Sequence, residues 1–161
     1  MIVVAIIAVL AAVVVPTFMK ESTRGRNKSE VSPMFAELGT REEQYKQENG
    51  AYLAATACPT AASDTGTDMT TATCSTTSGQ PWVSMRVSPS ETTLHCSYVI
   101  SIGAAGAAPN SDANWPTTWG SHAPPNPGTL ATGWYFVKAT CPTNEYLTTS
   151  WDSKIRSKDG K

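Results

Sequence analysis

The stretch MIVVAIIAVLAAVVV, residues 1–15, carries no polar side chain and is followed directly by Pro16. As an α-helix it would span about 22 Å, which is short of the ~30 Å hydrocarbon layer of a bilayer. It is also too long and too uniformly apolar for the amphipathic surface helix of a small domain. A secretory signal peptide fits poorly, because no basic residue precedes the stretch and no suitable small-x-small cleavage site follows it. A third interpretation is a membrane helix whose beginning precedes Met1.

The remainder of the chain has the composition of one secreted domain. About 145 residues follow the apolar stretch, which is enough for one modest core. The net charge of −1, with 16% charged residues, argues against a nucleic-acid-binding protein. Four cysteines without a CxxC pair indicate disulfides, and only two histidines accompany them, so a zinc site is not expected. No catalytic constellation or nucleotide loop occurs, so we expect neither an enzyme nor a cofactor.

Residues 17–50 continue the apolar stretch as an amphipathic helix. Their apolar side chains recur at i, i+3, i+4, i+7 and i+14, which places them on one helical face. Gly50 follows the last periodic residue and is a natural helix end. Pro16 and Pro33 each remove a backbone hydrogen bond and crowd the preceding turn, so we expect curvature or kinks at both. The face that we expect to pack on the head consists of Val31, Met34, Phe35, Leu38 and Tyr45.

Strand signals lie in the second half of the chain. Apolar and polar side chains alternate in residues 83–87, which are flanked by two prolines, and alternate most clearly in residues 94–102. Residues 134–139 and 145–151 predict a hairpin. The apolar face of such a sheet needs a cover, which the amphipathic helix supplies. The predicted fold class is α+β, with a long N-terminal helical spine packed against an antiparallel sheet of about four strands.

Two long loops complete the chain and hold cysteines or tryptophans. A bridge between Cys58 and Cys74 would close the first loop and stabilise the fold by about 3 kcal/mol on the chain-entropy account. We also predict a bridge between Cys96 and Cys141, although four cysteines allow three connectivities and the sequence does not choose among them. The second loop, residues 103–133, is rich in Pro, Gly and Asn.

Trp115 and Trp119 lie in this second loop and are candidates for surface contact with a ligand such as a sugar. Aromatic side chains that anchor a long loop to its domain are the commoner case. Residues 64–68, DTGTD, resemble an oxygen-rich calcium loop but lack its bidentate glutamate and its full spacing. We therefore predict no metal site.

The stretch MIVVAIIAVLAAVVVP, followed by Phe18 and then by mixed charge, closely resembles the N-terminal helix of type IV pilins and the related pseudopilins. Residues 29–31 (SEV) and 45–52 (YKQENGAY) support the resemblance, which is architectural only beyond Tyr52. In that family a basic leader is removed before a phenylalanine, and a short apolar stretch with one glutamate leads to the methionine that matches Met1. The resemblance implies that such residues precede Met1.

The resemblance implies a structural subunit of an extracellular type IV pilus, or fimbrium, used for adhesion, twitching motility or DNA uptake. The subunit would wait in the inner membrane, undergo processing by prepilin peptidase and methylation, and join copies of itself through the pilus assembly machinery. Residues 1–16 would form the hydrophobic membrane and filament-core helix, residues 17–50 its amphipathic continuation, and residues 51–161 the globular head. The side chains expected to pack in the filament core are Ile2, Val3, Ile6, Ile7, Val9, Leu10, Val13 and Val14.

Two other functions remain open at this point. A pseudopilin of type II secretion shares the same helix, but four cysteines argue against it. A membrane-tethered, monomeric binding protein would use the two loop tryptophans on a ligand. The basic cluster of Lys20, Arg24, Arg26 and Lys28 also has two interpretations. It either forms a solvated surface or pairs with acidic residues of another copy, namely Glu21, Glu30 or Glu37.

Overall fold

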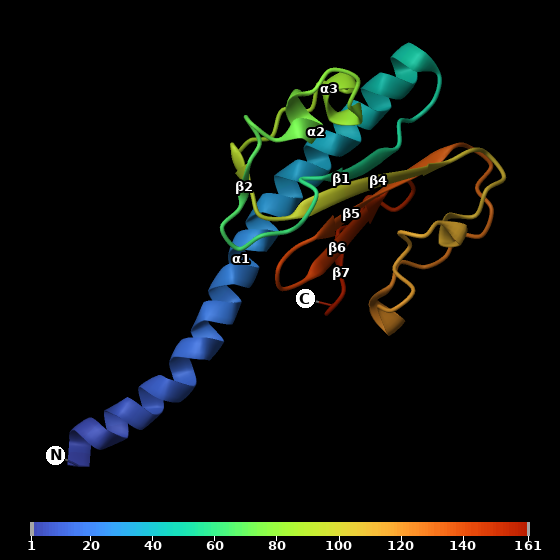
Figure 1. The fold of residues 1–161 in the computed structure, drawn as a ribbon. Coiled ribbons are helices and arrows are strands. Elements are labelled where there is room, and N and C mark those ends of the chain that lie inside the picture. The colour runs from blue at the N-terminus through green and yellow to red at the C-terminus, as the bar shows by residue number, and fades with distance from the viewer. Residues whose placement is uncertain (1, 161) are drawn as a thin grey trace.

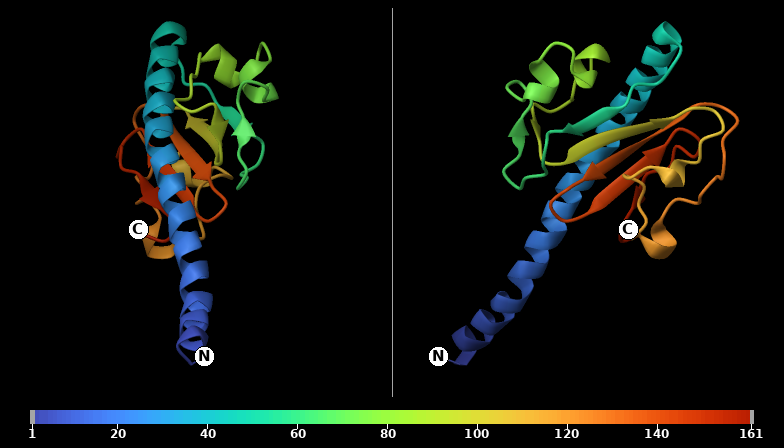
Figure 2. Two further views of the ribbon diagram at one scale, coloured as in Figure 1. Left: turned by 90° about the vertical axis from the view of Figure 1, so that its left-hand side faces the viewer. Right: turned by 45° about the vertical axis from the view of Figure 1, so that its right-hand side comes forward.

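The computed structural model describes residues 2–160, except for the side chains of Ile2, Ala5, Ala8, Val13, Pro16, Thr17 and Lys20. One long helix, α1 (Ile2–Asn49), dominates the molecule. Its C-terminal half lies across one face of a β-sheet, while its N-terminal half projects away from every other element (Figure 1). The side views show the same arrangement, with the C-terminus near the point where α1 leaves the sheet (Figure 2). We call residues 2–20 the stem and residues 21–160 the head.

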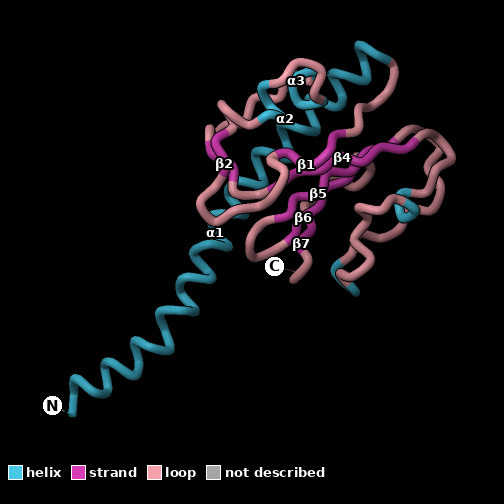
Figure 3. Tube along the Cα trace, viewed as in Figure 1, coloured by secondary structure: helices cyan, strands magenta, loops and turns pink. Residues whose placement is uncertain are grey.

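The head is built on a five-stranded antiparallel sheet. Long connections lie on both sides of its strands (Figure 3). A two-stranded ladder, β2 and β3, and four short helical turns lie within these connections. In spatial order the sheet consists of β1 (Ala55–Cys58), β4 (Ser97–Gly103), β5 (Trp134–Thr140), β6 (Glu145–Thr149) and β7 (Arg156–Ser157). The remaining elements are β2 (Thr67–Asp68), β3 (Thr93–Leu94), α2 (Thr73–Thr76), α3 (Pro81–Ser84), and the 3₁₀ turns η1 (Pro109–Ser111) and η2 (Gly120–His122).

The α+β class and the helix-on-sheet packing are confirmed. The predicted hairpin is also present, as β5 and β6, with Phe136 opposite Thr149 and Thr140 opposite Glu145. The sheet has one strand more than expected. Two of its strands, β1 and β7, were not predicted, and one predicted strand, residues 83–87, is absent. Both are short edge strands, of four and two residues, and neither has an alternating apolar pattern.

Two strand predictions are wrong. Residues 83–87 are not a strand, because Pro81 opens the short helix α3 at its first turn, where a fixed φ favours helix. Trp82 and Met85, three residues apart, then both reach the core. Residues 94–102 do not form one strand either. Leu94 ends β3 and pairs with β2, and β4 begins only at Ser97.

Helix α1 continues without a break through both prolines, Pro16 and Pro33. The stem curves relative to the rest of α1 (Figure 1), whereas the part that contains Pro33 runs straight across the sheet, so the kink expected there is absent. Pro33 and Ser29, whose carbonyl loses its helical donor, are both exposed. Water can therefore satisfy that carbonyl, and the buried face on the other side of the helix keeps the axis straight.

The main core lies between α1 and the sheet. Val31, Met34, Phe35 and Leu38 are at most 4% exposed there, and Tyr45 is half-buried at the edge. Phe35 meets the ring of Tyr98 edge-on, with ring centroids 6.2 Å apart. The side chains that the sheet and its flanking segments contribute to this core include Ile100, Val137, Ala139, Tyr146, Trp82, Met85 and Met69.

Gly103 provides a test of the sheet packing. It lies opposite Trp134 in the β4–β5 pair, and a Cβ at this position would lie 2.2 Å from two carbons of the indole. We expect Gly103→Ala to lower the free energy of unfolding by about 1–3 kcal/mol, because the indole must move. Urea unfolding of the full chain in a mild detergent, followed by tryptophan fluorescence, would measure this loss.

Gly25→Ala is the matched control for this experiment. A Cβ at Gly25 meets nothing within 4 Å, and the residue lies inside α1. Alanine there should raise the free energy of unfolding by about 0.5–1 kcal/mol, because glycine costs that much in a helix interior. Equal effects of the two substitutions would contradict the packing described for Trp134.

Candidate functional site

The stem is the most unusual surface of the molecule. Its described large side chains are 53–73% exposed, and no other element of the described chain covers them. Only one other large hydrophobic side chain among the described residues is exposed, that of Ile155. Exposed apolar area of this kind marks a contact with another molecule or with a membrane. The exposed set is Val3, Val4, Ile6, Ile7, Val9, Leu10, Val14, Val15, Phe18 and Met19.

The predicted filament-core residues therefore lie together on the stem, except that the side chains of Ile2 and Val13 fall outside those described. Within the described residues, no helix is both long enough and apolar enough to cross a membrane.

The stem meets the head at a polar junction. Arg24 forms an ion pair with Asp159, near the C-terminus. The Asn27 side-chain amide donates to the hydroxyl of Thr143, 3.1 Å away, and the Asn144 amide donates to Asp159 at 2.9 Å. These contacts join residues 24–27, in the middle of α1, to the turn after β5 and to the C-terminal tail. The direction in which the stem leaves the head is therefore set by polar contacts, which have a defined geometry.

The buried carboxylate of Glu30 forms a further link between α1 and the sheet. Its Oε2 accepts a hydrogen bond from the backbone N–H of His95 at 2.8 Å, and the Nδ1 of His95 lies 3.1 Å away. Its Oε1 accepts from the backbone N–H of Cys96 at 2.9 Å and from the Tyr98 hydroxyl at 3.0 Å. Burial and the Glu30 charge raise the pKa of Tyr98. Hydrogen bonds to an ionised acceptor are about twice as strong as neutral ones.

Several acidic residues are thus engaged within their own chain. Glu30 is 3% exposed and is not accessible to another copy, whereas Glu37 is half-buried and accepts from Arg41 at 2.8 Å. The pKa of Glu37 is lowered: burial raises it, but the hydrogen bonds from Arg41 and from the Ser88 amide outweigh that effect. Of the basic cluster, Arg24 is paired with Asp159, and Arg26 lies 3.9 Å from Asp64.

Pairing of Glu30 with another copy would require an accessible carboxyl, whereas this side chain is buried. The available signal was its position, because Glu30 stands four and eight residues before Met34 and Leu38 and therefore shares their face. Asn27 and Glu42 share this face as well, and all three are at most 3% exposed. Polar residues that share the spacing of the buried apolar face indicate buried hydrogen-bonding sites, for which the sheet has to supply the partners.

Two disulfides staple the head, which confirms that prediction. Cys58 is bonded to Cys74, with 5.7 Å between their Cα atoms, and Cys96 is bonded to Cys141, with 4.2 Å. The second bridge joins the segment held by Glu30 to the residue that follows β5. The first connects β1 to α2 and closes the loop that lacks a core of its own.

Trp115 and Trp119 belong to a second core and do not form a surface platform, which corrects their expected surface contact. They are 8% and 3% exposed and pack on the outer face of the sheet. The cause is mutual burial: Trp115 stacks on Trp151 with centroids 6.1 Å apart and meets Phe136 edge-on. The loop of residues 103–133 is thereby anchored to the sheet.

Glu145 holds the middle of this loop, at Trp119. It accepts a hydrogen bond from the Trp119 indole at 2.9 Å and from Lys158 at 3.1 Å, and Lys138 lies 3.5 Å away. Burial acts to raise the pKa of Glu145, but the hydrogen bonds from Trp119 and Lys158 outweigh it, so that the pKa is lowered. Lys158, which is exposed, and the indole of Trp119 therefore share one carboxylate.

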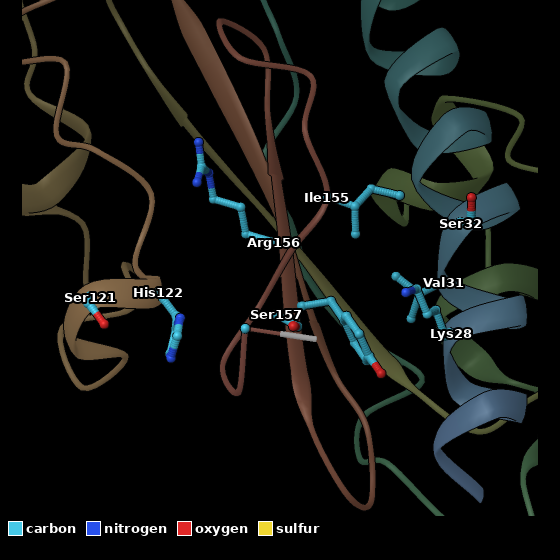
Figure 4. A pocket seen from close by; sticks show the side chains of 10 residues that line it. Lys28, Val31, Ser32, Ser121, His122, Ile155, Arg156 and Ser157 are labelled. Atoms are coloured by element: carbon cyan, nitrogen blue, oxygen red, sulfur yellow. The ribbon is translucent and has the colours of Figure 1, made fainter. Parts of the chain in front are cut away.

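A cavity of about 380 Å³ lies between α1, η2 and β7. Figure 4 shows Lys28 and Val31 on α1 at one side and His122 at the other, while Ile155 and Arg156 point to opposite sides of the chain between them. The basic side chains therefore do not converge on one point. Among the described residues no group of three potential metal ligands occurs, and residues 64–68 form none.

Comparison with known proteins returned no match to a protein-family model, to a curated protein or to a solved structure.

The role of Glu30 can be tested by Glu30→Gln. The amide keeps the shape of the side chain but loses the charge that accepts from His95, Cys96 and Tyr98. We expect the free energy of unfolding to fall by about 2–4 kcal/mol, as is usual when a buried charged acceptor is lost. Glu48→Gln, at an exposed position near the end of the same helix, should change it by less than about 0.5 kcal/mol. Urea unfolding would measure both variants. A similar loss of stability in the two would contradict the stabilising role of the buried Glu30 carboxylate.

Proposed function

We propose that this chain is a pilin-like structural subunit that polymerises through its stem into an extracellular filament of the type IV pilus kind. One observation carries the proposal. All but one of the large hydrophobic side chains exposed in the described chain lie on a single projecting helix, attached to a head stapled by two disulfides. The head buries its own apolar faces in two cores, so the stem is the surface that needs a partner.

The physical reason is the cost of leaving the stem in water. Burying a Val, Leu or Ile side chain stabilises by about 1.5–3 kcal/mol. The described side chains of residues 3–19 include no charged group, so identical stems can pack together without burying charge. Their contact would be head-to-tail, and such an interface need not close into a ring. Repetition of the contact gives a fibre with stems inside and heads outside.

Before assembly, a lipid bilayer is the other environment suited to the stem. A helix satisfies its own backbone hydrogen bonds, and its apolar side chains can contact lipid. We therefore propose an inner-membrane stage for the unassembled subunit. Prepilin peptidase and the pilus assembly machinery are the partners suggested by the same resemblance. Adhesion, twitching motility and DNA uptake are the uses that it suggests.

Leu10→Glu tests this function. Leu10 is 60% exposed on the stem, and a carboxylate there would have to be buried among neighbouring stems. We expect the amount of this chain in filaments sheared from producing cells to fall at least about ten-fold, since about 1.4 kcal/mol per subunit suffices for that factor. Electron microscopy and immunoblotting of the sheared fraction would measure it.

Ile155→Glu is the matched control, because Ile155 is the one large hydrophobic side chain exposed on the described head. This variant should still be recovered in filaments. If the unaltered chain stays entirely in the membrane fraction as a monomer, the proposal is wrong, and a tethered binding protein becomes the better account. Filaments of Leu10→Glu at unaltered yield would show that the stem is not the polymerising surface.

A further inference from the structure

The chain turns back on itself where α1 ends and the path to β1 begins. Gly50, with φ +81°, ends the helix, and its N–H donates to the carbonyl of Lys46 at 2.7 Å. Residues 51–54 then run back along α1 toward the sheet. Tyr52 packs edge-on against Tyr135 of β5, with ring centroids 4.8 Å apart. This returning segment is the first connection between the helix and the sheet.

Two neighbouring carboxylates hold the returning segment, in different surroundings. Glu42 is fully buried, and its Oε2 accepts from the backbone N–H of Leu53 at 3.0 Å. Its Oε1 is buried and has no hydrogen-bond partner among the described residues. Glu43 is exposed and accepts from the Tyr52 hydroxyl at 2.7 Å. One carboxylate is therefore solvated, while the other has a single donor inside the core.

The groups around Glu42 do not supply a compensating charge. On its own helix, Glu43 is acidic, and the Lys46 ammonium is directed to Tyr52, 3.0 Å from the hydroxyl and 4.3 Å from the ring centroid. From the returning segment and from β5 the titratable groups are Tyr52 and Tyr135, and both have a raised pKa, first because of burial. Among the described residues, Glu42 forms no ion pair.

The ionised form of Glu42 is therefore disfavoured in the folded chain. Burial raises the pKa of Glu42 to about 7, the nearby charge of Glu43 acts in the same direction, and the hydrogen bond from Leu53 acts against it. The neutral form can still accept the hydrogen bond from Leu53, because a protonated carboxyl keeps acceptor capacity.

We infer that Glu42 is a pH-sensitive latch, which holds residues 51–54 on α1 while it is protonated and loosens its hold on them as the surroundings become less acidic. The inference concerns the head alone and is independent of filament formation.

The direction of the effect follows from proton linkage. When the segment opens, Glu42 reaches water and its pKa returns to about 4.5, so the open form binds fewer protons than the closed form between pH 4.5 and 7. Opening is therefore increasingly favoured as the pH rises through this window, and it is constant above the pKa of the closed form. A pKa difference of about 2.5 corresponds to a change of about 300-fold in the opening equilibrium.

Hydrogen exchange of the Leu53 amide in the full chain, held in a mild detergent, tests the latch. Protection factors, corrected for the intrinsic pH dependence of exchange, should fall by about 80-fold between pH 4.5 and 7 and by about a further two-fold above pH 7 before they level off. Glu42→Gln should give a profile without this fall. Glu43→Gln is the matched control at the neighbouring position, and it should retain most of the fall because it leaves the buried carboxyl in place.

Parallel profiles for the unaltered chain and Glu42→Gln would overturn the inference. A direct measurement on the unaltered chain keeps the test decisive if Glu42→Gln does not fold. The carboxyl carbon of Glu42, observed by ¹³C NMR, should titrate with a midpoint near pH 7. A midpoint below about pH 5, close to that of a solvated carboxyl, would equally overturn it.

Discussion

One helix has to satisfy two environments, and this constraint organises the molecule. The first half of α1 carries apolar side chains on the faces that the structure describes, and the second half is apolar on one face only. A helix that is apolar all round requires an apolar surrounding, whereas an amphipathic one requires a sheet on one side and water on the other. The position of the head along α1 therefore decides how much apolar surface is left for other molecules.

Apolar contacts alone would not fix that position well. Packing of Val31, Met34 and Leu38 on the sheet tolerates small shifts, because hydrophobic burial is not directional. The polar residues of the same face are directional, since Asn27 and Glu30 each need particular donors and acceptors on the head. A slip of one helical turn would leave a buried carboxylate without donors, which costs several kcal/mol. These two residues thus define the register of helix on sheet.

The sequence allowed prediction of the features that depend on periodicity. The long helix with its buried face follows from the 3.6-residue spacing through Leu38. The β5–β6 hairpin follows from two runs rich in aromatic and β-branched residues on both sides of the turn at residues 141–144. The two-residue strand β7 could not be predicted, since its pairing with β6 depends on tertiary contacts. The burial of Trp82 could not be predicted either, because the proline-led helical turn at Pro81–Ser84 competes with the strand pattern of residues 83–87. Glu30 was missed because its partners are backbone amides 65 and 66 residues away in sequence.

The contact between Glu30 and Cys96 has a mechanical consequence. Tension applied along the stem enters the head at Arg24 and Glu30 and passes through a backbone N–H to Cys96. The covalent bond to Cys141 then divides it between β4 and the end of β5, two strands that share seven paired positions. The tryptophan-anchored loop between these strands lies outside this route. A pulled chain would therefore keep this loop in place while the stress is shared across the centre of its sheet.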